Sequence, residues 1–263
     1  GMATGSGLTT EAWLEPRGEG QALVVRLRRP ASAPPAPRAP LRLTLVVDRS
    51  ASMQRVWPDV VVLAEALLAT LAPTDEVQVV GIATGGRVLR PLGPLGDGAS
   101  VRAALRAGDV AGGPNHEAGL ELAWASATAG VRSRVVVITD GVPNEGAFLP
   151  EELGPRAGEV LAASGCTTTV VGLGSQFDAP LLRAIAASGG GGYHVGESAR
   201  LAPALSAELA GALAAPAEGP HVELALPAGL DVAGDAVGFT LEGRTATATV
   251  APMAPGAERR LVL

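Results

Sequence analysis

The sequence contains no lysine, and its 20 basic residues are all arginine. A chain without an amine side chain cannot supply the lysine of a Walker-type phosphate loop or of a kinase, and it cannot form a Schiff base. The net charge is −6 at pH 7, and the arginines are not clustered, which argues against nucleic-acid binding. The composition therefore excludes several enzyme classes and predicts that nucleic acid is not a partner.

Cysteine and long apolar runs are equally scarce. The single cysteine, Cys166, excludes an internal disulfide. The longest apolar stretch, residues 60–71, is interrupted by Glu65 and is too short to span a bilayer. We therefore expect a soluble monomer with no membrane span, and a cytoplasmic location is favoured.

The two ends of the chain suggest a fragment of a longer protein. Gly1 before Met2 is typical of a residue left by tag removal, so we expect the native N-terminus to be missing. Residues 261–263 end the chain inside an apparent strand.

The sequence divides into three segments, 1–40, 41–215 and 216–263. The first contains short strand-like runs at 12–14 and 22–27, followed by a proline-rich tract that predicts a boundary. The last contains four further short runs separated by glycine and proline, which predict strands at 222–226, 237–241, 245–250 and 260–263. Because neither segment can bury a core alone, we expect both chain ends to build one small antiparallel β domain.

The central segment, 41–215, alternates between strand and helix patterns. This alternation predicts an α/β fold, with a Rossmann-like, doubly wound and mostly parallel sheet and helices on both faces. The helix at 151–163 is expected to be weakened by Gly154 and Pro155. The strands are expected at 41–47, 77–83, 87–89, 134–139, 167–173 and 193–195, and the helices at 55–71, 101–106, 115–129, 151–163, 179–187 and 198–214.

Polar side chains follow two of these strands. Asp48, Ser50 and Ser52 come directly after the first strand, and Asp140 follows the strand at 134–139. In open parallel sheets, ligands bind beyond the carboxyl ends of the strands. Two carboxylates and two hydroxyls make an oxygen-only site, which suits Mg²⁺ or Mn²⁺. The alternative is a loop that only caps the following helix.

The same residues resemble the von Willebrand factor type A family. Asp48-Arg49-Ser50-Ala51-Ser52-Met53 is similar to the family's Asp-x-Ser-x-Ser metal-ion-dependent adhesion site, including the methionine that follows it. The segment Gly112–Leu120 resembles the family's Gly-Gly-Thr-Asn…Gly-Leu segment, and Thr139–Gly146 resembles its Thr-Asp-Gly loop. The last strand-helix-strand unit of the family is similar to 172–174, 181–186 and 190–193, so the resemblance covers about residues 41–214.

The resemblance implies a metal site and a binding function. By position, Asp48, Ser50 and Ser52 would ligate Mg²⁺ (or Mn²⁺ or Ca²⁺), and Asp140 would act through a bound water. The family's fifth ligand is a threonine, which is Pro114 here, so the resemblance implies weak metal binding. A water, a partner's carboxylate or Asn115 would have to fill that position. The implied function is a protein-binding module whose metal ion accepts an acidic side chain of a protein partner.

Two rival functions remain open at this point. One is a scaffold in which the metal site has decayed, which the proline at position 114 favours. The other is a metal-dependent phosphoesterase, which the absence of lysine and the serine at position 50 both disfavour. We therefore expect no enzymatic activity.

Three neighbouring residues carry secondary expectations. Pro114 is expected to open a helix as its first residue, where proline is well tolerated. Arg49 is expected either to be a solvated side chain or to meet an anionic partner. His116 is expected at an exposed helix start, with contact to a partner's acidic group as the alternative.

Overall fold

The computed structural model describes residues 8–32, 40–106, 112–214, 219–229, 232, 239–250 and 253–263. The chain forms two compact units. We call Pro40–Ala210 the α/β unit, and Gly1–Ala39 together with Gly211–Leu263 the β unit. None of the helices in the described part of the chain has the length and apolarity that a bilayer crossing requires.

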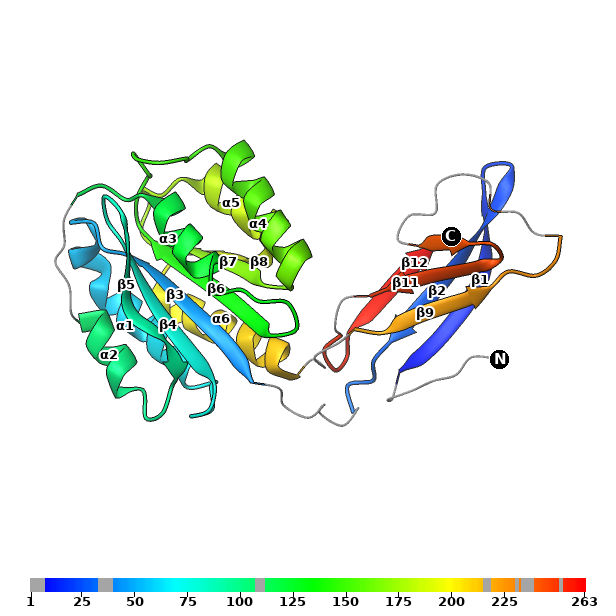
Figure 1. Ribbon diagram of the computed structural model, residues 1–263, viewed down its shortest axis with the longest axis horizontal. Coiled ribbons are helices and arrows are strands. Elements are labelled where there is room, and N and C mark those ends of the chain that lie inside the picture. The colour runs from blue at the N-terminus through cyan, green and yellow to red at the C-terminus, as the bar shows by residue number, and fades with distance from the viewer. Residues whose placement is uncertain are drawn as a thin grey trace. The chain divides into compact units, whose positions relative to one another are not determined.

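The α/β unit is built on a six-stranded sheet (Figure 1). Its neighbouring strands run parallel, except that β5 pairs antiparallel with β4. The predicted Rossmann-like, mostly parallel sheet is therefore confirmed. In spatial order the strands are β5 (Gly86–Pro94), β4 (Glu76–Ile82), β3 (Leu41–Asp48), β6 (Arg132–Thr139), β7 (Thr167–Gly172) and β8 (Gly190–Val195).

Helices pack on both faces of this sheet (Figure 1). Helices α3, α4 and α5 share one apolar core with the strands they cover. Helices α1 and α6 lie side by side, because Ser198 Oγ donates to Asp59 at 2.6 Å and Ser206 Oγ donates to the carbonyl of Ala66 at 3.1 Å. Covering both faces explains why every residue of β3 except Arg42 is buried. The helices are α1 (Met53–Leu68), α2 (Ala99–Arg106), α3 (His116–Trp124), α4 (Pro150–Ser164), α5 (Ala179–Gly189) and α6 (Ser198–Ala214).

Helix α4 differs from the expectation of an interrupted helix. It runs continuously from Pro150 to Ser164 with Pro155 inside it. A Cβ at Gly154 would lie 3.4 Å from the Cβ of Ala184 in α5. This is an ordinary van der Waals distance, so α4 and α5 pack in direct contact, and this packing outweighs the low helix propensity of Gly154 and Pro155.

The β unit consists of two three-stranded antiparallel sheets. One has the order β1-β2-β12 and the other β10-β11-β9. Buried residues of both sheets form one apolar core, including Val25 and Leu27 from the first and Val222 and Ala246 from the second. The strands are β1 (Thr9–Arg17), β2 (Gly20–Arg28), β9 (His221–Ala225), β10 (Thr240–Glu242), β11 (Thr245–Thr249) and β12 (Glu258–Val262).

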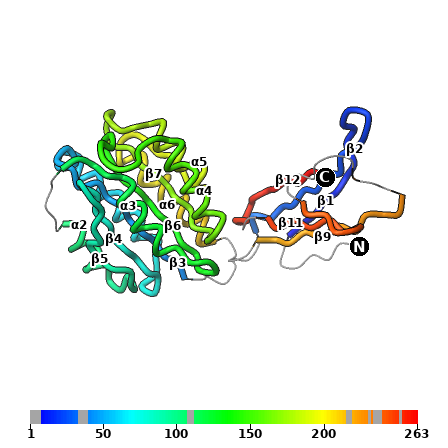
Figure 2. Tube along the Cα trace, turned by 45° about the horizontal axis from the view of Figure 1, so that its top comes forward, coloured from blue at the N-terminus to red at the C-terminus, as the bar shows by residue number. Residues whose placement is uncertain are grey.

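Strand β12 pairs with β2, so the first and last strands of the chain lie in one sheet (Figures 1 and 2). In this register Leu261 faces Val25, and Arg260 faces Arg26. The expectation that both chain ends build one antiparallel domain is therefore confirmed. Residues 237–238 of the strand expected at 237–241 lie outside the described residues.

Candidate metal-binding site

The candidate site lies at the carboxyl ends of β3 and β6, which are neighbours in the centre of the sheet. The chain continues from β3 to β4 on one side, whereas β6 lies on the other side. Such a reversal of strand order is where open α/β sheets bind their ligands. Asp48 is the last residue of β3, and Asp140 directly follows β6.

The structure brings all four predicted side chains together. Ser52 Oγ donates to Asp140 Oδ1 at 2.8 Å, and Ser50 Oγ lies 3.1 Å from Ser52 Oγ. Asp48 Oδ1 accepts the backbone N–H of Ser50 at 2.8 Å. Asp48, Ser50 and Asp140 are buried, whereas Ser52 is exposed, so solvent reaches the cluster from the side of Ser52.

The electrostatics of the cluster favour a cation. Burial raises the pKa of Asp140, and the charge of Asp48 raises it further, while the hydrogen bond from Ser52 and the charge of Arg55 oppose the shift. The carboxylates of Asp48 and Asp140 thus lie close together where little solvent screens their charges. The described residues contain no group of three or more His, Cys, Asp or Glu side chains suited to a metal. An ion here would be held by carboxylate and hydroxyl oxygens, which are ligands that Mg²⁺, Mn²⁺ and Ca²⁺ accept.

Pro114 borders the site without offering an oxygen from its side chain. A Cβ at Gly141 would lie 3.4 Å from Cγ of Pro114 and 3.5 Å from Asp48 Oδ2, so the proline ring and the carboxylate flank the same point. The carbonyl of Pro114 accepts the N–H of Asn144 at 3.3 Å. The four side chains that do carry oxygen, Asp48, Ser50, Ser52 and Asp140, fit a divalent cation that completes its coordination with water.

Asn115, rather than Pro114, sets the start of α3. Asn115 is the N-cap, and its Oδ1 accepts the N–H of Ala118 at 3.0 Å. Its Nδ2 donates to the carbonyl of Thr84 at 3.3 Å. The expectation that Pro114 is the first helical residue is therefore wrong by two positions. Since both ends of the Asn115 amide are engaged, this structure gives no support to Asn115 as a substitute ligand.

Arg49 is buried, which contradicts both sequence-based expectations for it. Its guanidinium lies 4.6 Å from the centre of the Trp57 ring, and Nη1 donates to the carbonyl of Leu105 at 3.1 Å. The side chain is only 6% exposed. A cation over an aromatic face, with a carbonyl as acceptor, keeps the charge satisfied inside the protein. The Arg49 side chain therefore packs inside the protein below the loop that carries Ser50 and Ser52, and it contacts neither solvent nor a partner protein.

His116 is also buried, at 1% exposure, so the expectation of an exposed helix start is wrong. Its Nε2 lies 3.1 Å from Thr139 Oγ1, and that hydroxyl donates to Asp48 Oδ2 at 2.7 Å. Burial lowers the pKa of His116, against the opposing effect of the Asp48 and Asp178 charges, and so disfavours the charged imidazole. Contact between a charged His116 and a partner's acidic group is excluded by this burial.

Thr139 was not singled out as a site residue from the sequence. The available signal was its position before Asp140, at the end of a strand with no other polar residue after Arg134. Because Asp48 and Thr139 are 91 positions apart, only the pairing of β3 with β6 brings the hydroxyl to the carboxylate.

The loop that follows Asp140 is firmly anchored on its inner side. Glu117 Oε2 accepts the N–H of Ala147 at 2.6 Å, and Glu117 Oε1 pairs with Arg156 Nη1 at 2.6 Å. Gly146 has a φ of +72°, and a Cβ at this position would collide with Asn115. A side chain at position 146 is thus excluded both by backbone conformation and by space.

The same loop exposes three large apolar side chains. Val142 is 54% exposed, Phe148 41% and Leu149 44%. We call these three residues the apolar rim.

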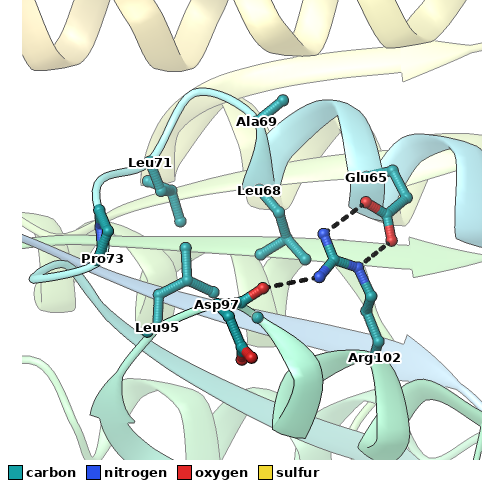
Figure 3. Close-up of a pocket in the computed structure, with 10 residues that line it drawn as sticks. Glu65, Leu68, Ala69, Leu71, Pro73, Leu95, Asp97 and Arg102 are labelled. Carbon is teal, nitrogen blue, oxygen red and sulfur yellow. Dashed lines mark hydrogen bonds and ion pairs between the residues drawn. The ribbon is translucent and has the colours of Figure 1, made fainter.

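A pocket of about 260 Å³ lies elsewhere, at the opposite end of α1 from Ser52 (Figure 3). Two of its charged side chains pair with each other, since Arg102 Nε donates to Glu65 Oε1 at 2.6 Å, and Arg102 Nη1 also donates to the backbone carbonyl of Asp97 at 2.8 Å (Figure 3). The pocket is separate from the candidate site.

Comparisons with known proteins agree with the fold of the α/β unit. Residues 43–142 match the family described as von Willebrand factor type A domain. None of the curated proteins matches the sequence significantly.

Three solved structures are similar in fold. The von Willebrand factor type A protein from Catenulispora acidiphila has a TM-score of 0.67 and 19% identity, over 92% of this chain and 59% of that chain. The ArnB paralogue VWA2 from Sulfolobus acidocaldarius has a TM-score of 0.60 and 12% identity, over 97% and 74% of the two chains. Proximal thread matrix protein 1 from mussel byssus, solved with a zinc-occupied MIDAS motif, has a TM-score of 0.54 and 17% identity, over 68% and 47%.

These similarities concern the fold. The chain spans about three fifths of the length of the Catenulispora structure and about half of the mussel structure.

Proposed function

Because this chain carries a von Willebrand factor type A domain, we propose that it is a protein-binding module that docks its partners at a divalent-cation adhesion site. The observation that carries the proposal is the convergence of Asp48, Ser50, Ser52 and Asp140 at the carboxyl edge of the sheet. Asp48, Ser50 and Ser52 would hold Mg²⁺, Mn²⁺ or Ca²⁺ directly, and Asp140 through a water. Such an ion would supply an open coordination position for an acidic side chain of the partner.

The surroundings of the site favour a protein partner over a small anion. The apolar rim begins two residues after Asp140, and its loop is held in place by Glu117. Arg55, on the first turn of α1, adds a positive charge that acts on Asp140. A protein segment that offers a carboxylate next to apolar side chains would match both the charge and the apolar rim.

The first prediction concerns Pro114. Replacing Pro114→Thr restores a hydroxyl beside the carboxylate of Asp48, and we expect Mg²⁺ affinity to rise about tenfold, or roughly 1–2 kcal/mol. Because Asn115 still caps α3, the helix start should survive the substitution. Calorimetric titration of both proteins with Mg²⁺ and Mn²⁺ measures the effect, and Pro114→Ala, which adds no oxygen, is the control. Equal Mg²⁺ affinity in all three proteins would show that the missing hydroxyl at position 114 does not weaken metal binding.

The second prediction concerns the apolar rim. With Mg²⁺ present, we expect phenylacetate to bind about fivefold more tightly than acetate, because its ring buries apolar surface worth roughly 1 kcal/mol. The double substitution Val142→Ser with Phe148→Ser should remove this preference and leave Mg²⁺ affinity unchanged. Titrations followed by NMR measure both affinities. Val62→Ser is the matched control, since Val62 is 46% exposed on α1. A preference that persists in the double variant would show that the apolar rim takes no part.

A scaffold with a decayed metal site remains the second candidate, and a specific observation favours it. Asp48 accepts hydrogen bonds at both oxygens and Asp140 accepts one from Ser52, so the cluster is partly satisfied by the chain itself. The same titrations decide between the two candidates. If neither the wild type nor Pro114→Thr binds Mg²⁺ or Mn²⁺, the scaffold replaces the adhesion site.

We propose no catalytic activity for this chain. Ser50 stands where a metal-dependent phosphoesterase of this kind would carry a second aspartate, and the chain has no lysine to hold a phosphate. Assay with p-nitrophenyl phosphate in Mg²⁺ tests this directly, and turnover that disappears in Asp48→Asn would overturn the proposal.

A further inference from the structure

We propose that His116 is a positioning residue for the cation site, because its imidazole N–H orients the hydroxyl of Thr139, which in turn fixes the carboxylate of Asp48. The inference rests on the proposed function, since the site that His116 would position is the adhesion site described above.

The three side chains form a continuous line of hydrogen bonds. His116 Nε2 lies 3.1 Å from Thr139 Oγ1, and Thr139 Oγ1 lies 2.7 Å from Asp48 Oδ2. The exposed fractions are 1% for His116 and 0% for Thr139 and Asp48. Because solvent does not reach these side chains, water cannot replace a hydrogen bond that a substitution removes.

The direction of each hydrogen bond follows from the chemistry of the groups. An ionised carboxylate only accepts, so the single proton of the Thr139 hydroxyl points to Asp48. The backbone N–H of Gly141 donates to the same hydroxyl at 3.1 Å. His116 must then donate to the remaining lone pair of the Thr139 hydroxyl. The imidazole proton is therefore on Nε2, and Nδ1 is unprotonated.

The other ring nitrogen shows why a merely structural role is an incomplete explanation. His116 Nδ1 is buried and has no hydrogen-bond partner within the described part of the chain. A buried acceptor without a partner lowers stability, and an apolar ring of similar size would avoid this loss. Within the described residues, the bond to Thr139 is the one hydrogen bond that the His116 side chain makes.

The consequence for the site is a carboxylate held at both oxygens. Ser50 N–H donates to Asp48 Oδ1 at 2.8 Å, and Thr139 donates to Oδ2. Mg²⁺ requires near-ideal octahedral geometry, so a ligand with a fixed orientation binds it better than one that rotates. Groups that orient metal ligands in this way typically contribute about 10–100-fold to metal affinity.

The test compares two substitutions at one position. His116→Phe keeps a ring but removes the N–H, and we expect Mg²⁺ and Mn²⁺ affinity to fall about tenfold. The melting temperature of the metal-free variant should be equal to or higher than that of the wild type. His116→Gln offers an amide N–H toward Thr139 and should recover most of the affinity. The control is His221→Phe, because His221 is exposed in the β unit and should leave metal affinity unchanged.

A second readout does not depend on metal. The ¹⁵N spectrum of the histidine rings in the metal-free protein should show His116 as the neutral tautomer with its proton on Nε2. A proton on Nδ1, or wild-type metal affinity in His116→Phe, would overturn the inference. If the wild type binds neither ion, the adhesion site itself fails and His116 has nothing to position; the wild-type titration alone identifies that outcome.

Discussion

Replacing Asp48→Asn is expected to lower Mg²⁺ affinity by roughly 100-fold or more, because losing the charge of a direct ligand exceeds the effect of losing a group that only orients one. Asp48 is the innermost of the four oxygen donors, and its carboxylate ends β3 directly at the site. Neither serine can replace the charge, since a hydroxyl is a neutral and weaker ligand.

The same substitution should leave the metal-free fold intact. Asp48 and Asp140 are both buried, and the charge of Asp48 raises the pKa of Asp140, so the two carboxylates repel each other when no cation is bound. Removing one charge relieves this repulsion and offsets the hydrogen bonds that an amide makes less well. We therefore expect the melting temperature in EDTA to stay the same or rise. Asparagine is used instead of alanine because alanine would leave the Thr139 hydroxyl and the Ser50 N–H without an acceptor.

Calorimetry with Mg²⁺ and thermal unfolding in EDTA measure the two effects of Asp48→Asn. Asp97→Asn is the control, because Asp97 is exposed beside the pocket at the far end of α1. A large loss of stability in EDTA would mean that Asp48 is chiefly structural, and unchanged Mg²⁺ affinity would place the ion, if any, elsewhere.

Replacing Asp75→Ala is expected to destabilise the α/β unit by about 3 kcal/mol, because two backbone N–H groups lose their acceptor at about 1–3 kcal/mol each. Asp75 Oδ1 accepts the N–H of Leu41 at 3.1 Å, and Oδ2 accepts the N–H of Ala72 at 2.7 Å. The residue is fully buried. Its carboxylate thereby ties the first residue of β3 to the turn that follows α1.

For a unit of this size, a loss of about 3 kcal/mol lowers the melting temperature by roughly 6–12 °C. Asp75→Asn keeps one acceptor oxygen and should fall between the wild type and Asp75→Ala. Asp97→Ala removes only the acceptor of the exposed Ala99 N–H and should cost about 1 kcal/mol or less. Unfolding followed by circular dichroism measures all three variants. If Asp75→Ala lowers the free energy of unfolding no more than Asp97→Ala does, the hydrogen bonds of the buried Asp75 carboxylate do not stabilise the unit as the structure indicates.

The sequence alone determined where the four oxygen donors lie relative to the sheet. Strand and helix periods are local properties, and they predicted that Asp48 and Asp140 follow buried parallel strands. Since parallel strands present their carboxyl ends at one edge, the meeting of the two carboxylates with Ser50 and Ser52 followed from the pattern. The pairing of the chain ends in the β unit was predictable for a similar reason, because neither end has enough apolar surface to fold alone.

Only the tertiary structure decided which polar side chains are buried beside that site. Arginine is mostly exposed in folded proteins and histidine is intermediate, and nothing within a few positions of Arg49 or His116 predicts burial. Their side chains form hydrogen bonds with residues farther along the chain, Leu105 for Arg49 and Thr139 for His116, and Thr139 also donates to Asp48. The continuity of α4 through Pro155 also depends on the tertiary structure, since the packing of Gly154 against Ala184 of α5 outweighs the low helix propensity of glycine and proline. Local sequence patterns determine the helices and strands, and they determine which strand ends lie at the same edge of the sheet. The burial of a polar group depends on partners brought to it by the fold, and a single sequence does not encode those partners as a pattern.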